Sequence, residues 1–513
     1  MSIEIELKLS IAPAQVGKLA RCPPLIAATR SRPVTRRVYN VYYDTPERDL
    51  ASHGMALRLR RVGGRWVQTL KAGGGAQTGL HRNGEYEIAL AAPLLNFAAL
   101  ASTPAAKLTS QAVFRERLRP MFVTDFRRTA RLIEVAPGMS AEFAVDRGTI
   151  VAGDAREPIC ELELELREGE ADALFAFARR LLEYVPFTIG MESKAARGFA
   201  LLTPKPAVPV RAVSPVIART ASSDDAFVAI ARSCLQQLVA NDRGVIGSDD
   251  VEYIHQARVA IRRLRSAFGL FRTIVPREAV ATTLAEVQRV GAALGAARDW
   301  DVFVTQTLPA VQHAFAADAG IASLSQGAAT LRAMRRNEAI ATIAAPAYTA
   351  MLIEIERLLA SRPWRTVPAA SAQAQAQALA DGPAREFAAT LFTRQLRRVR
   401  HHGKTLAALT TDELHALRIE IKKLRYAVEF FEGLYSRRAV RSFLGGAADL
   451  QELLGQLNDA TTTGHLLDGI EQDTPELRRA GGIVLGWTAA RTITDMAHLG
   501  TAWRHFKAAR PFW

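Results

Sequence analysis

The sequence predicts an α+β multidomain protein with a β-rich first half and an all-α second half. Up to about residue 203, short segments alternate apolar and polar side chains, as half-buried strands do. Beyond residue 222, long segments rich in Ala, Leu and Arg indicate helices. A proline-rich linker over 204–221 separates the two halves, and 513 residues are enough for two or more domains with cores of their own.

The overall charge favours anionic partners. The net charge is +15 and the isoelectric point is about 10.1, which suits nucleic acid, a phosphate-rich polymer or an acidic membrane. No apolar run is long enough to span a bilayer, and the first strand begins without a targeting segment, so we expect no membrane partner. Three scattered cysteines without metal spacing suit a reducing, cytoplasmic location.

The opening strand places charged residues on one face. Glu4, Glu6 and Lys8 alternate with Ile5 and Leu7, and a strand turns such residues to the same side. Taken alone, the pattern is typical of a solvated strand face.

A second strand pattern argues against the interpretation of these charged faces as solvated. The segment ICELELEL puts Glu161, Glu163 and Glu165 on one face, where like charges repel. Hard divalent cations bind carboxylate oxygens, so a bound cation would explain why three acids share this face.

Other strand segments carry charge at the same period of two. They contain Arg58 and Arg60, Lys71 beside Thr69, Glu85 and Glu87, and Glu142 and Asp146. Arg128 lies in a basic strand whose inward face the pattern leaves open, and Lys194 and Arg197 follow in SKAARG. In a barrel one strand face lines the lumen. A lumen with both signs of charge suits a phosphate-rich substrate, held by basic groups, and a metal, held by carboxylates.

These segments, taken in order, resemble the CYTH domain, also called the triphosphate tunnel metalloenzyme family. The resemblance covers residues 1–203 and rests on ExExK at the start, RLR, a lysine-bearing strand, ELELEL and SKAARG. It implies an eight-stranded antiparallel β tunnel that hydrolyses or transforms triphosphates with Mg²⁺ or Mn²⁺.

The resemblance also implies roles for residues. Glu4 and Glu6 would be catalytic, orienting the attacking water, while Glu85 and Glu87 would orient basic residues. The phosphate-binding residues would be Lys8, Arg58, Arg60, Lys71, Arg128, Lys194 and Arg197. The metal ligands would be Glu4, Glu6, Asp146, Glu163 and Glu165, with the choice among Glu161, Glu163 and Glu165 left open.

The helical half contains an internal duplication. The segment 253–271 matches 413–431 at an offset of 160, and LGAARD matches LGQLND at the same offset. In both helices a histidine and basic residues recur at i, i+3, i+7 and i+10, which forms one stripe. A solvated charged face is the alternative, but the stripe is of one sign and has few acids at i+4, which favours an anion site. The candidate residues are His255, Arg258, Arg262, Arg263, Arg265, His415, Arg418, Lys422, Lys423 and Arg425.

This half resembles the CHAD domain, over about 222–505. The resemblance implies two four-helix bundles, here repeats of about 222–360 and 384–505 around a loose segment from Ser361 to Pro383, and it implies binding of inorganic polyphosphate. In the second repeat Lys replaces Arg at two positions. We expect Asp299, Asp301 and Asp459 to be salt-bridge or helix-end partners that order the basic residues.

The order of the two domains resembles that of bacterial inorganic triphosphatases. It implies metal-dependent hydrolysis of tripolyphosphate to pyrophosphate and phosphate, with polyphosphate bound by the helical half, in the cytoplasm or at polyphosphate granules. Three alternatives stay open: a thiamine triphosphatase, a class IV-type adenylate cyclase and a non-catalytic polyphosphate scaffold. The sequence shows no dedicated aromatic clamp for a base, although four aromatics could stack on one: Tyr39, Tyr42, Tyr43 and Trp66. Nucleic acid is disfavoured because the basic helices lack interleaved aromatics, and the sequence leaves a homo-oligomer open.

Overall fold

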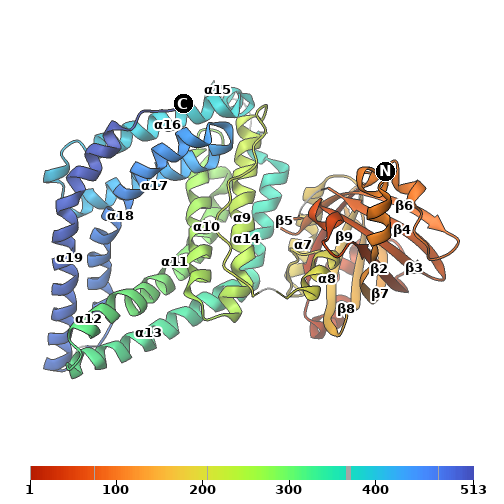
Figure 1. Cartoon of the computed structure of the whole chain (residues 1–513), viewed down its shortest axis with the longest axis horizontal. Helices are drawn as coiled ribbons and strands as arrows, with labels where there is room; N and C mark the ends of the chain where they lie inside the picture. The colour runs from red at the N-terminus through yellow and green to blue at the C-terminus, as the bar shows by residue number, and fades with distance from the viewer. Residues whose placement is uncertain (1, 74–75, 205, 366–370, 472) are drawn as a thin grey trace. The chain divides into compact units, whose positions relative to one another are not determined.

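The computed structural model describes residues 2–73, 76–204, 206–365, 371–471 and 473–513 (Figure 1). The chain forms two compact units. The first comprises Met1–Val208 and Pro346–Ser361, and the second comprises Pro209–Ala345 and Arg362–Trp513. Among the described residues no single helix is long and apolar enough to cross a membrane, although the bent pair Ala319–Ala344 and Pro346–Arg365 together has the necessary length and composition.

The first unit is built on a closed antiparallel barrel. Its strands are β1 (Ser2–Ser10), β2 (Val34–Asp44), β3 (Met55–Val62), β4 (Arg65–Ala72), β6 (Leu80–Leu90), β7 (Arg119–Ala136), β8 (Met139–Ala152) and β9 (Ala155–Glu168), with short β5 (Ala76–Gln77) and β10 (Thr188–Ile189) at the edges. The order is β1-β9-β8-β7-β2-β3-β4-β6, and β6 pairs with β1 to close the ring. The predicted eight-stranded tunnel is confirmed.

Strand register turns the predicted charged residues to one side. Lys8 of β1 lies opposite Glu163 of β9, and Asp146 of β8 lies opposite both Glu161 of β9 and Arg128 of β7. Residues directly opposite each other in a sheet point to the same face. The register therefore also settles the face of Arg128, which the sequence left open.

Helix α8 (Lys194–Leu202) packs against the inner face of the barrel. Phe199 of α8 shares a buried cluster with Tyr42 of β2 and Phe122 of β7. A Cβ on Gly198 would lie 2.1 Å from the Phe122 ring, so glycine is needed for this close approach. The side chain of Ser193 caps the helix by accepting from the Ala196 amide, which places Lys194 in the first turn inside the barrel.

The outside of the barrel is covered by the remaining helices of this unit. They are α1 (Val16–Leu19), α2 (Pro23–Ala28), α3 (Asp49–Ser52), α4 (Phe97–Leu100), α5 (Ala106–Thr109), α6 (Ala112–Arg117), α7 (Ala171–Leu182) and α14 (Pro346–Ser361). Helix α7 packs on β7, β1 and β9, and α14 packs on α7. The sequence assigned 346–361 to the first helical repeat, but in the structure this segment is part of the barrel unit.

The second unit is all helical. It contains α9 (Ser223–Gly247), α10 (Val251–Leu270), α11 (Ala281–Val302), α12 (Leu308–Ala314), α13 (Ala319–Ala344), α15 (Ser371–Asp381), α16 (Ala384–His402), α17 (Thr411–Phe431), α18 (Arg437–Asp468) and α19 (Pro475–Ala508). In the first repeat α9 packs on α10, α10 on α11 and α11 on α13; in the second α16 packs on α17, α17 on α18 and α18 on α19 (Figure 1). Contacts of α10 with α17 and of α13 with α19 join the repeats.

One sequence expectation in this half is corrected. The stretch 361–383 was expected to be loose, but Ser371–Asp381 forms α15. Its low-complexity sequence consists mainly of Ala, Gln and Leu, all of which are good helix formers. Low complexity here therefore does not mean lack of structure.

Candidate functional site: a charged tunnel and a basic cavity

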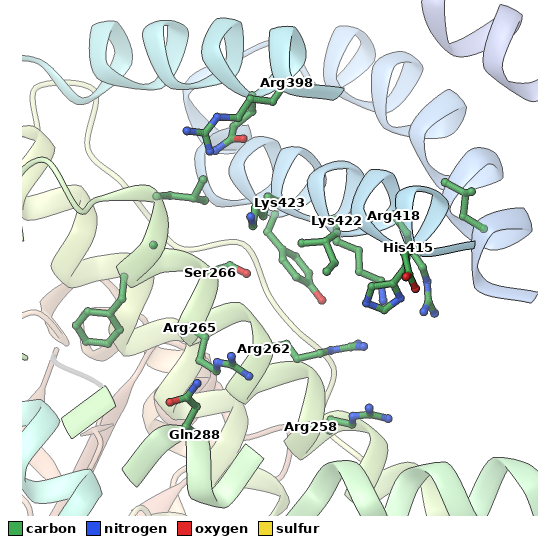
Figure 2. Close-up of a pocket in the computed structure, with 18 of the residues that line it drawn as sticks. Arg258, Arg262, Arg265, Ser266, Gln288, Arg398, His415, Arg418, Lys422 and Lys423 are labelled. Atoms are coloured by element: carbon green, nitrogen blue, oxygen red, sulfur yellow. The ribbon is translucent and has the colours of Figure 1, made fainter. Parts of the chain in front are cut away.

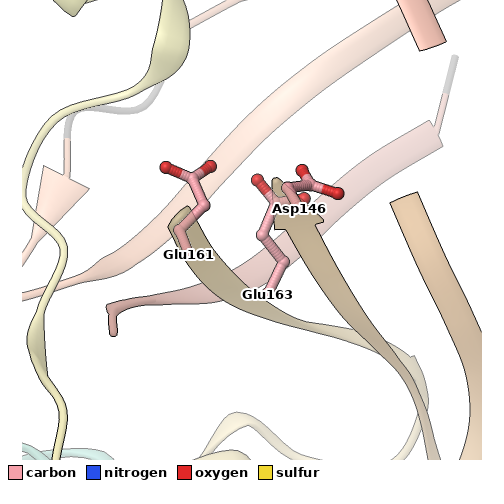
Figure 3. A group of neighbouring side chains, drawn as sticks. All are labelled: Asp146, Glu161 and Glu163. Atoms are coloured by element: carbon pink, nitrogen blue, oxygen red, sulfur yellow. The ribbon is translucent and has the colours of Figure 1, made fainter. Parts of the chain in front are cut away.

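Three carboxylates meet inside the barrel, on the paired strands β8 and β9 (Figure 3). Asp146, Glu161 and Glu163 are buried, and each offers an oxygen within 4.8 Å of the others. Buried carboxylates this close repel one another unless cations are supplied.

Two lysines and an arginine supply much of that compensation. The Nζ of Lys194 lies 2.6 Å from Asp146 and 2.9 Å from Glu163, and it also contacts Glu161. Arg128 donates two hydrogen bonds of 2.8 Å to Asp146 and contacts Glu163. Lys8 contacts Glu163 as well and lies 2.9 Å from Glu6.

These contacts keep Glu163 and Glu6 ionised despite their burial. Burial would raise the pKa of Glu163, but Lys194, Lys8 and Arg128 hold it well below its usual value. Burial opposes ionisation of Glu6 in the same way, and Lys8 outweighs it, so the pKa of Glu6 falls to about 2. Both side chains are thus anionic oxygen donors at neutral pH.

A second acidic group lies on the β1 side of the lumen and comprises Glu4, Glu6 and Glu165. Lys71 contacts Glu4 and lies 3.8 Å from Glu6. Burial, together with the charges of Glu4, Glu142 and Glu6, raises the pKa of Glu165 to about 7 against the opposing effect of Arg167. Negative charge here is not fully balanced by the basic side chains. The donor set is all carboxylate oxygen, which fits Mg²⁺ or Mn²⁺.

The opposite wall of the lumen is basic. Arg58 lies 3.4 Å from Glu85, which is also 3.7 Å from Lys71, so Glu85 orients basic residues as expected. Glu87 instead accepts a 2.9 Å hydrogen bond from Thr69. On the acidic side of the lumen, Arg197 of α8 pairs with Glu157 at 2.6 Å and with Glu161 at 3.1 Å.

Arg60 carries charge that is poorly balanced. Its Nε donates to the Asn40 amide oxygen at 3.0 Å. Burial and the neighbouring Arg58 and Arg128 lower the pKa of Arg60 to about 10. An anionic ligand beside Arg60 would relieve this repulsion.

A cavity of about 380 Å³ opens beside Arg60 and Arg128. It is lined by Ser31, Arg32, Val34, Arg36, Val38, Arg60, Val62, Arg128, Ala130, Arg131, Leu132 and Glu142. Arg32 and Arg36 were not predicted as site residues from the sequence. The signal for Arg36 was present, because it has the same strand parity as Val38, Asn40 and Tyr42.

The proposed base-stacking aromatics have other contacts. Tyr42 is buried and stacks on Phe122 with ring centroids 4.5 Å apart. Tyr43 packs on the outer cluster around Leu57, and Arg61 lies over the ring of Trp66. These contacts leave the cavity lining to arginine and aliphatic side chains, Ser31 and Glu142.

The second unit has its own basic cavity, of about 1200 Å³. Side chains of α10 and α17 point toward one another across it (Figure 2). Of the predicted anion-binding residues, it is lined by Arg258, Arg262, Arg265, His415, Arg418, Lys422 and Lys423.

Three predicted residues are not among those that line this cavity. Arg263 is buried with its guanidinium 5.2 Å from the Phe430 ring centroid, because it lies one residue, and thus about 100°, around the helix from Arg262. Arg425 pairs with Glu429 at 3.0 Å. His255 lies at the end of the stripe, where burial and nearby Arg298 lower its pKa to about 4.

Other cationic residues of the cavity were not predicted from the sequence. They are Arg272, Arg277, Arg398 and His465, which come from several elements and share no motif with the stripe. The expected salt-bridge partners are confirmed for Asp299, 2.8 Å from Arg258, and Asp301, 2.7 Å from Arg332. The side chain of Asp459 lies outside the described residues.

The fold and the two sites define a two-part protein: a closed β tunnel with a charged lumen, followed by duplicated helices around a basic cavity. The sequence matches the CYTH domain family over residues 2–199 and the CHAD domain family over residues 229–468. The chain therefore carries an N-terminal CYTH domain and a C-terminal CHAD domain.

Individual relatives agree with this assignment. The chain is 36% identical over 204 residues to an inorganic triphosphatase of Haemophilus influenzae, covering 39% of this chain and 54% of that protein. It is 28% identical over 331 residues to an uncharacterized protein of Mycobacterium tuberculosis, covering 58% of each. The chain thus spans little more than half the length of these relatives.

A solved structure of the CHAD domain from the plant Ricinus communis is similar to the second part of the molecule. It is 29% identical, with a TM-score of 0.51, and the match covers 59% of this chain and 98% of that one.

Proposed function

We propose that the protein is a metal-dependent inorganic triphosphatase that cleaves tripolyphosphate to pyrophosphate and phosphate in its tunnel. The observation that carries the proposal is the cavity beside Arg60, where arginines and aliphatic side chains adjoin a buried carboxylate cluster. Phosphoryl oxygens are matched by guanidinium groups. The lining holds arginine rather than aromatic side chains, which favours inorganic phosphate over a nucleotide or thiamine substrate.

The charged residues of the lumen would have two roles, phosphate binding and metal binding. Arg58, Arg60 and Arg128 would hold the phosphate chain and offset charge as the bridging bond breaks. Glu4, Glu6, Asp146, Glu163 and Glu165 would hold Mg²⁺ or Mn²⁺, which supplies charge neutralisation and a more acidic water.

Glu6 would orient the attacking water rather than take its proton. With a pKa of about 2, its carboxylate accepts a hydrogen bond well but is a weak base at neutral pH. Lys8, 2.9 Å away, fixes the direction of the carboxylate.

The CHAD domain would bind inorganic polyphosphate in the cavity between α10 and α17, in the cytoplasm or at polyphosphate granules. The support is a cavity of about 1200 Å³ lined by basic side chains from both copies of the repeat. Long polyanions are held by such matched cationic surfaces.

The test is phosphate release from tripolyphosphate, ATP, thiamine triphosphate and long-chain polyphosphate, with Mg²⁺ or Mn²⁺. We expect metal-dependent release that is fastest from tripolyphosphate and falls roughly 100-fold or more in Glu6→Gln. Glu116→Gln, which removes an exposed carboxylate, is the matched control. A preference for ATP or thiamine triphosphate, or release unchanged in Glu6→Gln, would contradict the proposal.

A further inference from the structure

We propose that the tunnel carries an outer phosphate subsite, formed by Arg32 and Arg36, which holds phosphoryl groups beyond the third of a linear polyphosphate. The inference rests on the proposed function of the same tunnel. It adds a substrate class, polyphosphates longer than three units, and two residues that the tunnel motifs do not include.

Strand geometry places Arg36 on the wall of the lumen. It lies four residues from Asn40, the partner of Arg60, and so shares its strand face. The register of β2 with β7 sets Arg36 opposite Arg128. Arg36, Arg60 and Arg128 all line the one cavity.

Arg32 is held at the same end of the cavity by the backbone before β2. The Arg30 amide donates to the Leu132 carbonyl at 2.9 Å, and the Leu132 amide donates to Ser31 Oγ at 2.8 Å. These hydrogen bonds hold the segment against β7, so the backbone of Arg32 has a fixed position beside the cavity.

The charges in this cavity are out of balance. Its lining contains five arginines and one carboxylate, Glu142, which is itself 2.9 Å from Arg167. Arg128 is paired with Asp146, but in the described part of the chain no acidic side chain lies within ion-pair distance of Arg32 or Arg36. Arg36 and Arg128 also face each other as like charges across two strands, which is destabilising. An anion seated between them would remove both penalties.

The shape of the lumen gives the direction in which a longer chain must run. Phe199 of α8, with Tyr42 and Phe122, fills the lumen at one end of β2. Arg36 lies toward the other end, and four residues of strand from Asn40 to Arg36 span roughly 13 Å. A phosphate chain that begins beside Arg60 and lengthens in this direction therefore runs toward Arg36, and then Arg32.

The experiment compares tripolyphosphate with tetrapolyphosphate in the full-length protein. In Arg36→Ala we expect kcat/KM for tetrapolyphosphate to fall roughly tenfold, the effect of one charged hydrogen bond, and kcat/KM for tripolyphosphate to fall less than about threefold. Arg37→Ala is the matched control: it removes the same charge from the next residue, whose side chain points outward to Asp125 at 2.9 Å. Arg36→Lys should recover only part of the loss, because an ammonium lacks the bidentate fork.

Equilibrium binding of tetrapolyphosphate, measured by calorimetry without metal, separates this inference from the proposed function. The CHAD cavity is the same in Arg36→Ala and Arg37→Ala, so a difference in their affinity for tetrapolyphosphate reports binding in the tunnel. If wild type cleaves tripolyphosphate but Arg36→Ala lowers kcat/KM for both substrates by the same factor, the outer subsite is refuted and the triphosphatase proposal stands. If wild type cleaves nothing, the triphosphatase is refuted. The binding comparison then decides the subsite, because weaker binding in Arg36→Ala alone supports it and equal binding overturns it.

Discussion

The Nζ of Lys194 lies 2.6 Å from Oδ2 of Asp146, where the first turn of α8 meets β8 inside the barrel, and both side chains are buried. The same ammonium contacts Glu161 and Glu163 and lies 4.9 Å from the Phe126 ring centroid. One helix terminus thus supplies the counter-charge for three strand carboxylates. This makes Lys194 both a structural cation and a candidate phosphate ligand.

Replacing Lys194 by Gln should destabilise the barrel unit by roughly 3 kcal/mol or more, because it leaves buried carboxylates without their cation. Thermal unfolding with and without Mg²⁺ or Mn²⁺ checks this. Either ion should restore part of the lost stability, because it would bind the carboxylates that the substitution leaves without a cation. Lys18→Gln, which removes an exposed lysine from α1, should change little. An unchanged midpoint in Lys194→Gln would contradict the assigned role.

Cutting the chain after residue 208 should weaken the barrel, since α14 comes from residues 346–361 and packs on α7. The fragment 1–208 would expose apolar surface of α7 that the full chain covers, at a cost of roughly 25 cal/mol per Å². We expect it to unfold at a lower temperature than the barrel in the full chain and to bind an apolar dye. Addition of a peptide spanning 343–363 should reverse both effects; a fragment as stable as the full chain would show that α14 is dispensable.

Removing one arginine from each side of the CHAD cavity should weaken polyphosphate binding and also make that binding less dependent on salt. For Arg262→Ala with Arg418→Ala we expect the slope of log K against log salt to fall by roughly 1.5, from counterion release. Titrations of long-chain polyphosphate at several salt concentrations measure it. Arg335→Ala, on α13 and paired with Glu338, is the control. Equal slopes in the two proteins would place polyphosphate elsewhere.

His255 should make the helical unit sensitive to acid. Burial and the charge of Arg298, with smaller effects of Arg262 and Arg258, outweigh the opposing effect of Glu252 and lower its pKa from 6.5 to about 4. The unfolded chain then binds more protons between pH 4 and 6.5, so the stabilising effect of neutral His255 is present above pH 6.5 and lost as pH falls toward 4.

The variant His255→Asn removes this titration. The unfolding midpoint of His255→Asn minus that of wild type should be more positive at pH 4.5 than at pH 7.5. His313→Asn, which replaces an exposed histidine, is the control. A difference between wild type and His255→Asn that does not change with pH would refute the assignment.

Much of the tunnel could be predicted because strand faces follow from local alternation. Glu4, Glu6 and Lys8 had to share a face, as did Glu161, Glu163 and Glu165, whatever the rest of the chain did. The constant offset between the two basic helices likewise needed only the sequence. Motif order then linked these faces to a barrel and the offset to a duplicated helical domain.

Local sequence patterns are therefore enough to predict the two-part architecture, the charged strand faces and the basic stripe. Three further features depend on the folded arrangement: Arg128 and Arg36 face each other in the lumen, Lys194 contacts three carboxylates, and α14 packs on α7. It also turned Arg262 toward the cavity and Arg263 into the core. Alternation and helical period are properties of neighbouring residues, whereas register, closure and helix packing bring together residues distant in the chain, and no local pattern encodes which partner each will meet.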